Sequence, residues 1–310
     1  MTNGIRSAET FGPVRPLPEG GVTRWTAVLA DYWTLTKPEV NFLIVITTFA
    51  GFYLASPALP HPWSLLLFNT LFGTLLVASG TGTLNQYMER HFDAQMRRTA
   101  KRPLPAGRMI PTHALWFGVL LAVAGGLYLA LLVNFLASWL AMLTLGTYLL
   151  FYTPLKRKTP LCTLVGAFPG AVPPLIGWAG ARGSLSLEAW VLYAIVFLWQ
   201  FPHFMAIAWM YREDYSRAGI LMLPVVEPNG RVTAQQIVVY TLMLLPVSLL
   251  PFALGMAGRI YLYGAIVLGL LFLYSSLRAA FSMSRQQARR LLLASVLYLP
   301  LLFILMVLNA

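Results

Sequence analysis

The sequence predicts an all-α protein embedded in a membrane, with about nine transmembrane helices. Hydrophobic residues make up 58% of its 310 residues, charged residues make up only 10%, and the mean hydropathy is +0.69. Soluble domains are roughly half apolar and a quarter charged, so this composition indicates a membrane protein. A helix that crosses a bilayer needs about 20 mostly apolar residues, and the chain contains many such runs.

Apolar runs between charges and Pro or Gly residues define the nine predicted helices. In chain order they cover 39–57, 64–84, 113–133, 136–153, 162–180, 188–210, 235–256, 260–281 and 289–308. The fifth run is rich in glycine and proline, so we expect it to be bent and to approach its neighbours closely. Residues 1–30 are predicted to form a polar tail, disordered over its first 24 residues and without a signal peptide. Residues 31–310 are predicted to form a single domain.

The Lys and Arg residues are distributed very unevenly over this topology. One side of the membrane holds the N-terminal tail, the segments 85–112, 154–161 and 211–234, and 282–288 with its flanks. Only Arg182 and Arg259, of the 22 Lys and Arg residues, fall on the other side. Because cytoplasmic loops are rich in Lys and Arg, we expect a cytoplasmic N-terminus and a C-terminus outside. The net charge of +12 then reflects topology, and we do not expect nucleic acid as a partner. The single cysteine excludes an intramolecular disulfide and a cysteine-rich metal site.

The segment 85–105, NQYMERHFDAQMRRTAKRPLP, combines carboxylates and cations at the end of the second apolar run. Asn85, Glu89, Asp93 and Arg97 stand four residues apart, so an extension of the second helix would present them as one stripe. A Mg²⁺ ion would relieve the repulsion between the two carboxylates, since it takes one or two carboxylates together with phosphate oxygens. The following basic residues suit phosphate binding. The sequence therefore predicts a site for a metal and a diphosphate; the alternative is a solvated helix end whose charges pair with each other.

A second charged cluster, YREDYSR at 211–217, follows the sixth apolar run. Asp214 either binds a second metal ion or a water opposite Asp93, or it pairs locally with Arg217. Within the apolar run itself, Gln200 and His203 flank Pro202, and strongly polar groups at such depth usually face a cavity or the bundle interior. His203 could ligate a metal centre, orient a substrate, or bond to a neighbouring helix. The basic segment 156–158 either only sets the topology or reaches the diphosphate.

These passages resemble the UbiA-type intramembrane prenyltransferases. The segment 85–105 is similar to the first aspartate-rich motif of that family. Four further passages agree: LTKPEV at 35–40, YTPLKRKTP at 152–160, GAFPGAVPPLIGW at 166–178 and WQFPHFMAIAWMYREDY at 199–215. The resemblance extends over roughly residues 30 to 308, and the last passage is typical of the branch formed by the protoheme IX farnesyltransferases, or heme O synthases.

The resemblance implies nine helices around a central cavity that opens laterally to lipid, in the inner membrane of a bacterium. It implies farnesyl diphosphate and heme B as substrates and Mg²⁺ as the cofactor. The farnesyl group would be transferred to a heme vinyl group with addition of water, giving heme O and diphosphate. A heme A synthase is an expected partner.

The site residues follow from these motifs and from the two clusters. For the metal and the catalytic site we expect Asn85, Glu89, Asp93 and Asp214. For the diphosphate we expect Arg97, Arg98, Lys101, Arg102, Lys156, Lys158 and Arg212. For the heme acceptor we expect His203, Gln200, Tyr211 and Tyr215. The second motif of the family is usually acid-rich at four-residue spacing, whereas here it reads YREDY, which argues against a symmetric two-metal arrangement.

Three alternatives stay open at this point. A prenyltransferase for another aromatic acceptor, a quinone or chlorophyll precursor, would share the first cluster. A secondary transporter would have a similar number of spans, although it would carry its charged groups near the membrane midplane rather than at one face. A purely structural or assembly protein would give no reason for the clustered acids.

Overall fold

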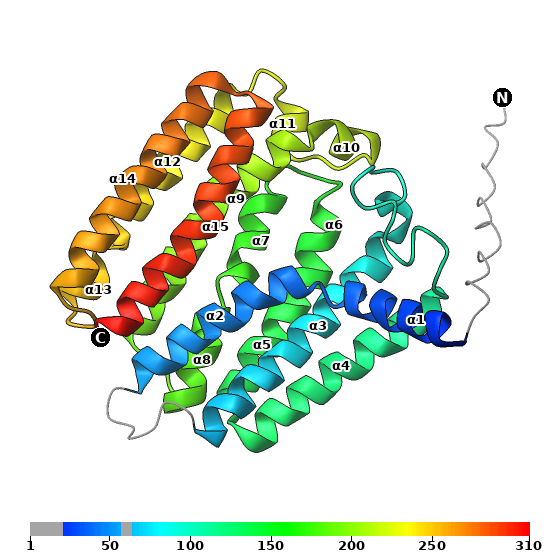
Figure 1. Cartoon of the computed structure of the whole chain (residues 1–310), viewed down its shortest axis with the longest axis horizontal. Helices are drawn as coiled ribbons and strands as arrows, with labels where there is room; N and C mark the ends of the chain where they lie inside the picture. The colour runs from blue at the N-terminus through cyan, green and yellow to red at the C-terminus, as the bar shows by residue number, and fades with distance from the viewer. Residues whose placement is uncertain (1–20, 57–63) are drawn as a thin grey trace.

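The computed structural model describes residues 21–56 and 64–310, and within these ranges it contains helices and no strand (Figure 1). The helices are α1 (Gly21–Leu35), α2 (Pro38–Ala55), α3 (Leu65–Asp93), α4 (Pro111–Leu132), α5 (Phe135–Thr147), the π-helical turn η1 (Tyr148–Tyr152), α6 (Thr153–Leu155), α7 (Cys162–Gly170), α8 (Pro173–Arg182), α9 (Leu187–Met210), α10 (Arg212–Arg217), α11 (Leu223–Val226), α12 (Arg231–Val247), α13 (Leu250–Ala253), α14 (Arg259–Ser282) and α15 (Arg285–Leu308).

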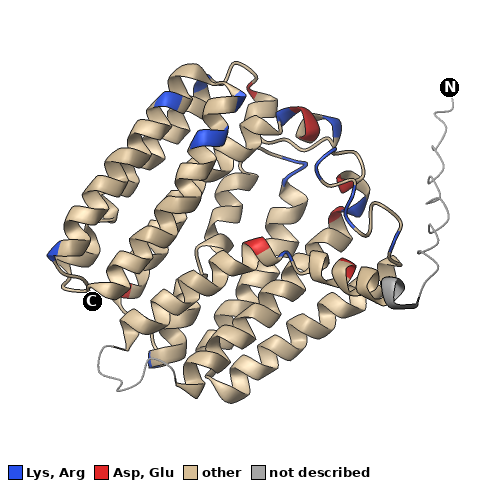
Figure 2. Ribbon diagram, viewed as in Figure 1, with Lys and Arg blue, Asp and Glu red and all other residues tan. Residues whose placement is uncertain are grey.

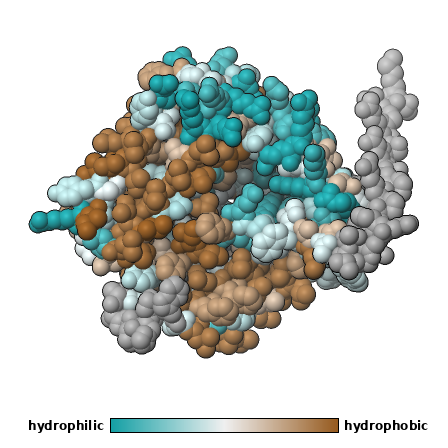
Figure 3. All heavy atoms as spheres, in the orientation of Figure 1, coloured by the Kyte–Doolittle hydropathy of each residue, from teal (hydrophilic) through white to brown (hydrophobic). Residues whose placement is uncertain are grey.

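Nine helical segments of the described chain are long and apolar enough to cross a bilayer, which confirms the predicted fold class. They lie side by side in one bundle, and the long helix α9 packs against α7, α8, α12 and α15 (Figure 1). Nearly all Lys and Arg residues of the described chain lie toward one end of the bundle (Figure 2). Hydrophilic residues gather at the same end, whereas most of the remaining visible surface is apolar (Figure 3). We call this end the charged face.

The second spanning helix, α3, is longer than its apolar run. It continues through Asn85 and Glu89 and ends at Asp93, so the predicted helical extension is confirmed up to that residue. The prediction that Arg97 continues the stripe is wrong. The chain leaves the helix after Asp93 and turns, and the Thr99 hydroxyl donates a hydrogen bond of 2.8 Å to the main-chain carbonyl of Asp93.

The fifth span is broken into α7 and α8, as its proline and glycine content predicted. The break precedes Pro173, and α8 then packs directly on the backbone of α2. A Cβ atom added to Gly177 would lie 2.8 Å from the amide nitrogen of Phe52 and closer still to the carbonyl oxygen of Thr48. A Cβ atom on Gly51 would likewise overlap the backbone of Pro174. The two helices therefore approach closely because glycine lies on both sides of the contact.

The helix α1 begins at Gly21 and so overlaps the last third of the N-terminal tail predicted for residues 1–30; residues 1–20 lie outside the described residues. Trp25, Leu29 and Trp33 are spaced four residues apart and are exposed, whereas Asp31 is buried. An exposed row of tryptophan and leucine beside polar residues suits the surface layer of a bilayer. The other side of α1 is fixed to the bundle: Gln86 donates hydrogen bonds to the main-chain carbonyls of Thr34 and Leu35.

The ion pair between Asp31 and Arg108 joins α1 to the loop after α3. Arg108 reaches both carboxylate oxygens, at 2.7 to 3.1 Å, and also donates to the carbonyl of Lys101. We expect Arg108→Gln to weaken this attachment by about 1 kcal/mol, since the guanidinium is partly exposed to solvent. The loop should then be cleaved several times faster by trypsin, which proteolysis of the protein in nanodiscs measures. An unchanged cleavage rate would show that α1 does not restrain the loop.

Candidate functional site

The polar end of α3 carries three side chains that share one face: Asn85, Glu89 and Asp93. We call them the acceptor stripe. Each one receives a different cationic side chain. Lys37 donates to Asn85 Oδ1 at 2.6 Å, Lys156 to Glu89 Oε1 at 2.7 Å, and Arg102 to Asp93 Oδ2 at 2.7 Å. Asn85 also donates from Nδ2 to the hydroxyl of Thr153, at 3.1 Å.

The three cations come from three different segments of the chain. Lys37 precedes α2, Lys156 follows α6, and Arg102 lies in the loop after α3. Lys37 has a left-handed backbone with φ 54°, and Met283 is the only other described non-glycine residue with a positive φ. Such a conformation costs free energy in a residue with a Cβ, and strain of this kind is common at functional sites. Lys37 was not among the predicted site residues. A lone lysine before Pro38, at the start of an apolar run, is nevertheless recognisable in the sequence as a candidate.

The protein environment moves the pKa of the two lysines in opposite directions. Burial, followed by the nearby positive charge of Arg102, lowers the pKa of Lys37 to about 7. Burial also acts to lower the pKa of Lys156, but the Glu89 carboxylate and the tyrosines beside it outweigh this and leave it well above its usual value. Lys37 is therefore easier to deprotonate than Lys156.

The acceptor stripe has donor groups that suit a hard divalent cation. Two carboxylates and one amide oxygen lie on consecutive turns of one helix face, and Asn85 and Asp93 are only 1% exposed. Among the described residues there is no group of three or more His, Cys, Asp and Glu side chains that could hold a metal ion, so substrate oxygens would have to complete the site. This arrangement fits Mg²⁺, which is usually bound by one or two carboxylates together with substrate phosphates and water.

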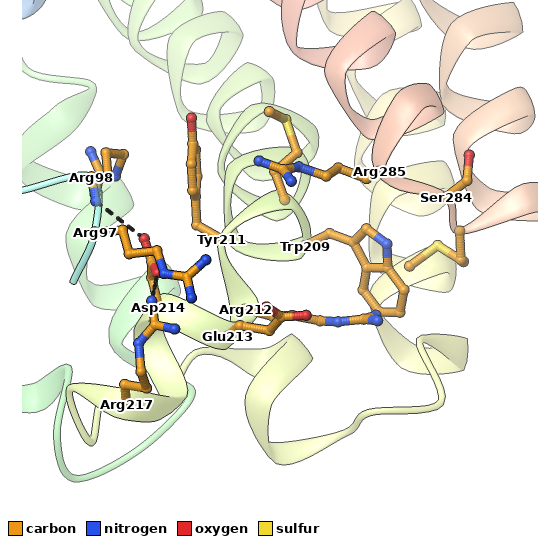
Figure 4. A pocket seen from close by; sticks show the side chains of 12 residues that line it. Arg97, Arg98, Trp209, Tyr211, Arg212, Glu213, Asp214, Arg217, Ser284 and Arg285 are labelled. Atoms are coloured by element: carbon orange, nitrogen blue, oxygen red, sulfur yellow. Dashed lines mark hydrogen bonds and ion pairs between the residues drawn. The ribbon is translucent and has the colours of Figure 1, made fainter. Parts of the chain in front are cut away.

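The second charged cluster forms a pocket at the charged face. Asp214, on α10, is paired with Arg217, and it also accepts a hydrogen bond of 3.3 Å from the main-chain amide of Arg98. The predicted local pair with Arg217 is thus present, and the same carboxylate joins α10 to the loop after α3. Around it lies a pocket of about 560 Å³, which we call the arginine pocket (Figure 4). Its lining residues come from that loop, from the end of α9 and α10, and from the start of α15.

The structure divides the predicted diphosphate-binding residues into three groups. Arg102 and Lys156 lie on the acceptor stripe. Arg97, Arg98 and Arg212 line the arginine pocket, which no residue of the stripe lines. The side chains of Lys101 and Lys158 are exposed and take part in no ion pair of the described residues.

The predicted acceptor residues are not gathered in one place either. His203 uses Nδ1 for a 2.8 Å contact with the hydroxyl of Ser295 on α15, which is the bond to a neighbouring helix considered above. Gln200 is buried and donates to the carbonyl of Ala167 in α7. Tyr211 lines the arginine pocket, with the guanidinium of Arg98 5.1 Å from its ring centre. Tyr215 packs against a small apolar cluster beneath α10.

Comparison with known proteins agrees with this architecture. The model of the UbiA prenyltransferase family matches residues 44–306. A structure of digeranylgeranylglyceryl phosphate synthase has a TM-score of 0.74 at 17% identity, over 91% of this chain and 98% of that one. A UbiA homolog from Archaeoglobus fulgidus bound to GPP and Mg²⁺ has a TM-score of 0.60 at 18% identity, over 89% and 99% of the two chains. At these identities the structures show the shared fold.

The fold and the polar end of α3 define an intramembrane prenyltransferase, and the chain belongs to the UbiA prenyltransferase family. Within that family the chain is similar to curated protoheme IX farnesyltransferases. The protoheme IX farnesyltransferase of Solibacter usitatus (strain Ellin6076) is 53% identical over 91% of this chain and 99% of its own length. That of Koribacter versatilis (strain Ellin345) is 49% identical over 94% and 96%. The chain is thus a member of the protoheme IX farnesyltransferase branch.

Proposed function

We propose that the protein transfers the farnesyl group of farnesyl diphosphate to a vinyl group of heme B, with addition of water, giving heme O and diphosphate. The high identity to curated protoheme IX farnesyltransferases over nearly the whole chain supports the acceptor and the donor. The observation in the structure that carries the proposal is the acceptor stripe with one cation on each member. A quinone or chlorophyll acceptor is not favoured, since the relatives act on protoheme IX by name.

The acceptor stripe is the proposed place of the Mg²⁺ ion and of the diphosphate. A solved UbiA homolog was bound to GPP and Mg²⁺, which supports a divalent metal here. Asn85, Glu89 and Asp93 would hold the metal, which when bound withdraws charge from the diphosphate as a Lewis acid. Lys37, Lys156 and Arg102 would release their present partners and donate to phosphate oxygens instead. Cations aimed at the leaving diphosphate stabilise the charge that develops as the bond to the farnesyl group breaks.

The remaining chemistry needs no covalent nucleophile from the protein. Loss of diphosphate leaves an allylic cation, which aromatic side chains can stabilise and an apolar site shields from water. Tyr148 and Tyr152, on the π-helical turn beside Lys156, are the aromatic side chains next to the stripe. The heme vinyl group then attacks the cation, and water adds to the resulting cationic centre and releases one proton, which leaves a hydroxyl group on the product.

We also propose the orientation and the cellular setting. Because the charged face holds nearly all Lys and Arg residues, it is the cytoplasmic face of a bacterial inner membrane. Nine spans then place the end of α15 on the opposite side. A heme A synthase is the proposed partner, since it would consume the product.

The decisive experiment is pigment analysis after expression in bacterial membranes that lack heme O. The expected result is that heme O appears, that its formation in isolated membranes requires added farnesyl diphosphate, and that a magnesium chelator prevents it. Accumulation of a prenylquinone in place of heme O would assign another acceptor. Failure to form any prenylated pigment in membranes that contain the folded protein would refute the proposal.

A further inference from the structure

The arginine pocket has more positive charge than its acidic residues can balance. Five arginines line it: Arg97, Arg98, Arg212, Arg217 and Arg285. Asp214 is satisfied by Arg217 and by the main-chain amide of Arg98. Within the described ranges, Arg97, Arg212 and Arg285 form no ion pair with a carboxylate. The three come from separate segments of the chain, so that their guanidinium groups surround one space.

The unpaired guanidinium groups belong to residues that line the pocket. The guanidinium of Arg212 lies 4.4 Å from the ring centre of Trp209, a contact that occupies the face of the group and leaves its N–H edge available. Arg285 extends from α15 toward Tyr211, and Arg97 reaches into the pocket from the opposite side (Figure 4). Guanidinium edges of this kind bind carboxylates bidentately.

The position of Arg285 is unfavourable for helix stability. It is the first residue of α15, where the helix dipole disfavours a positive charge. It follows Met283, which lines the same pocket and has a left-handed backbone with φ 42°. Both Met283, with its strained backbone, and Arg285, with its charge at a helix N-terminus, line this pocket. Because neither feature stabilises the fold, we take them as signs of ligand binding.

From this geometry we infer that the arginine pocket binds the two propionate carboxylates of the porphyrin acceptor, separately from the diphosphate on the acceptor stripe. The inference rests on the proposed function. A porphyrin of the heme B type is apolar over its ring and carries both carboxylates on one edge. A pocket at the charged face, with Trp209 and Tyr211 in its lining, offers charge to that edge and aromatic surface next to it.

The positions of His203 on α9 and Asn85 on α3, measured from the charged face, agree with this assignment. Seven residues separate His203 from Met210, which lines the pocket, so in an α-helix the two share one face about 10 Å apart. A porphyrin with its carboxylates in the pocket would extend along α9 toward His203. Its vinyl groups, on the edge opposite the propionates, would point into the membrane. Asn85 also lies about 12 Å deeper than Asp93 along α3, so donor and acceptor would meet below the charged face.

The test compares heme B with its dimethyl ester, in which both propionates are neutral. The full-length protein in nanodiscs is titrated with each porphyrin, and binding is followed by the Soret absorption without farnesyl diphosphate. We expect the unaltered protein to bind heme B roughly 10-fold or more tightly than the diester, since the diester lacks both of the charges that the guanidinium groups would bind. Equal binding of the two porphyrins would overturn the inference without the use of any variant.

Variants then test whether the arginine pocket causes the difference in affinity between heme B and the diester. The double variant Arg97→Gln/Arg285→Gln should lose most of the preference for heme B over the diester, while the KM for farnesyl diphosphate stays unchanged. The matched control is Arg289→Gln/Arg290→Gln, which removes two exposed arginines of α15 that do not line the pocket. A raised KM for farnesyl diphosphate with unchanged heme binding would assign the pocket to the diphosphate and overturn the inference. The proposed function fails by a separate criterion, the absence of heme O formation by the unaltered protein.

Discussion

Replacement of Asp93 by Asn is expected to reduce the rate of heme O formation roughly 100-fold or more, the scale observed when one group that stabilises transition-state charge is removed. The side chain keeps its shape but loses the charge that would bind the metal and that now holds Arg102 at 2.7 Å. The turn after α3 should persist, because Thr99 bonds to the main-chain carbonyl of Asp93 rather than to its side chain. Heme O formed by the purified protein in nanodiscs, at saturating substrates, is the measurement.

Two observations would make this result interpretable. Glu188→Gln removes a carboxylate from the start of α9, at the end of the bundle away from the stripe, and should leave the rate unchanged. The thermal unfolding midpoint of the Asp93→Asn protein should stay within a few degrees of the unaltered protein. An Asp93→Asn enzyme with full activity would exclude the metal and diphosphate role of the stripe.

Replacement of Gly177 by Ala is expected to prevent accumulation of the folded protein, the largest stability effect that the fold predicts. The added methyl group would lie 2.8 Å from the amide nitrogen of Phe52 and overlap the carbonyl oxygen of Thr48. Neither is the end of a flexible side chain, so α2 and α8 would have to separate. The destabilisation should reach or exceed about 3 kcal/mol, the upper range for overpacking. Fluorescence-detected size-exclusion chromatography of membrane extracts measures the folded fraction.

Gly146→Ala provides the matched control. Gly146 lies in α5, and a Cβ atom there would meet nothing within 4 Å. Because alanine favours a helix more than glycine does, this variant should be neutral or slightly more stable. If Gly177→Ala were recovered in normal amounts, the close contact of α2 with α8 would not be required for folding.

The fold could be predicted closely because membrane helices must be long and apolar. All nine spans follow from the apolar runs, and the break before Pro173 follows from the proline and glycine of the fifth run. The helix α1 could not be recognised in the same way. It is short and polar on one side. Its position depends on hydrogen bonds from Gln86 and Arg108, which lie far along the chain from it.

The site could be predicted in part. Regular four-residue spacing identified the acceptor stripe, because that pattern is local to one helix. Two of the three partners of the stripe are not local: Lys37 and Lys156 lie 48 and 67 residues from the groups they bind. The four-residue spacing also placed Arg97 on the stripe. The helix ends at Asp93, however, where the loop turns back and Thr99 bonds to the carbonyl of Asp93, and the spacing pattern does not reveal this. Arg285 gave no signal at all, because only packing of α15 against the end of α9 brings it to Arg97 and Arg212.

The pairing of each stripe residue with its own cation also bears on how the protein is made. Many metal sites are unstable when empty, because their ligands repel one another, and such domains fold only when the metal is supplied. Here the chain carries its own counter-charges, because Lys156 pairs with Glu89 and Arg102 pairs with Asp93. We therefore expect the helical bundle to assemble without magnesium, since the two carboxylates of the stripe are already paired with cations.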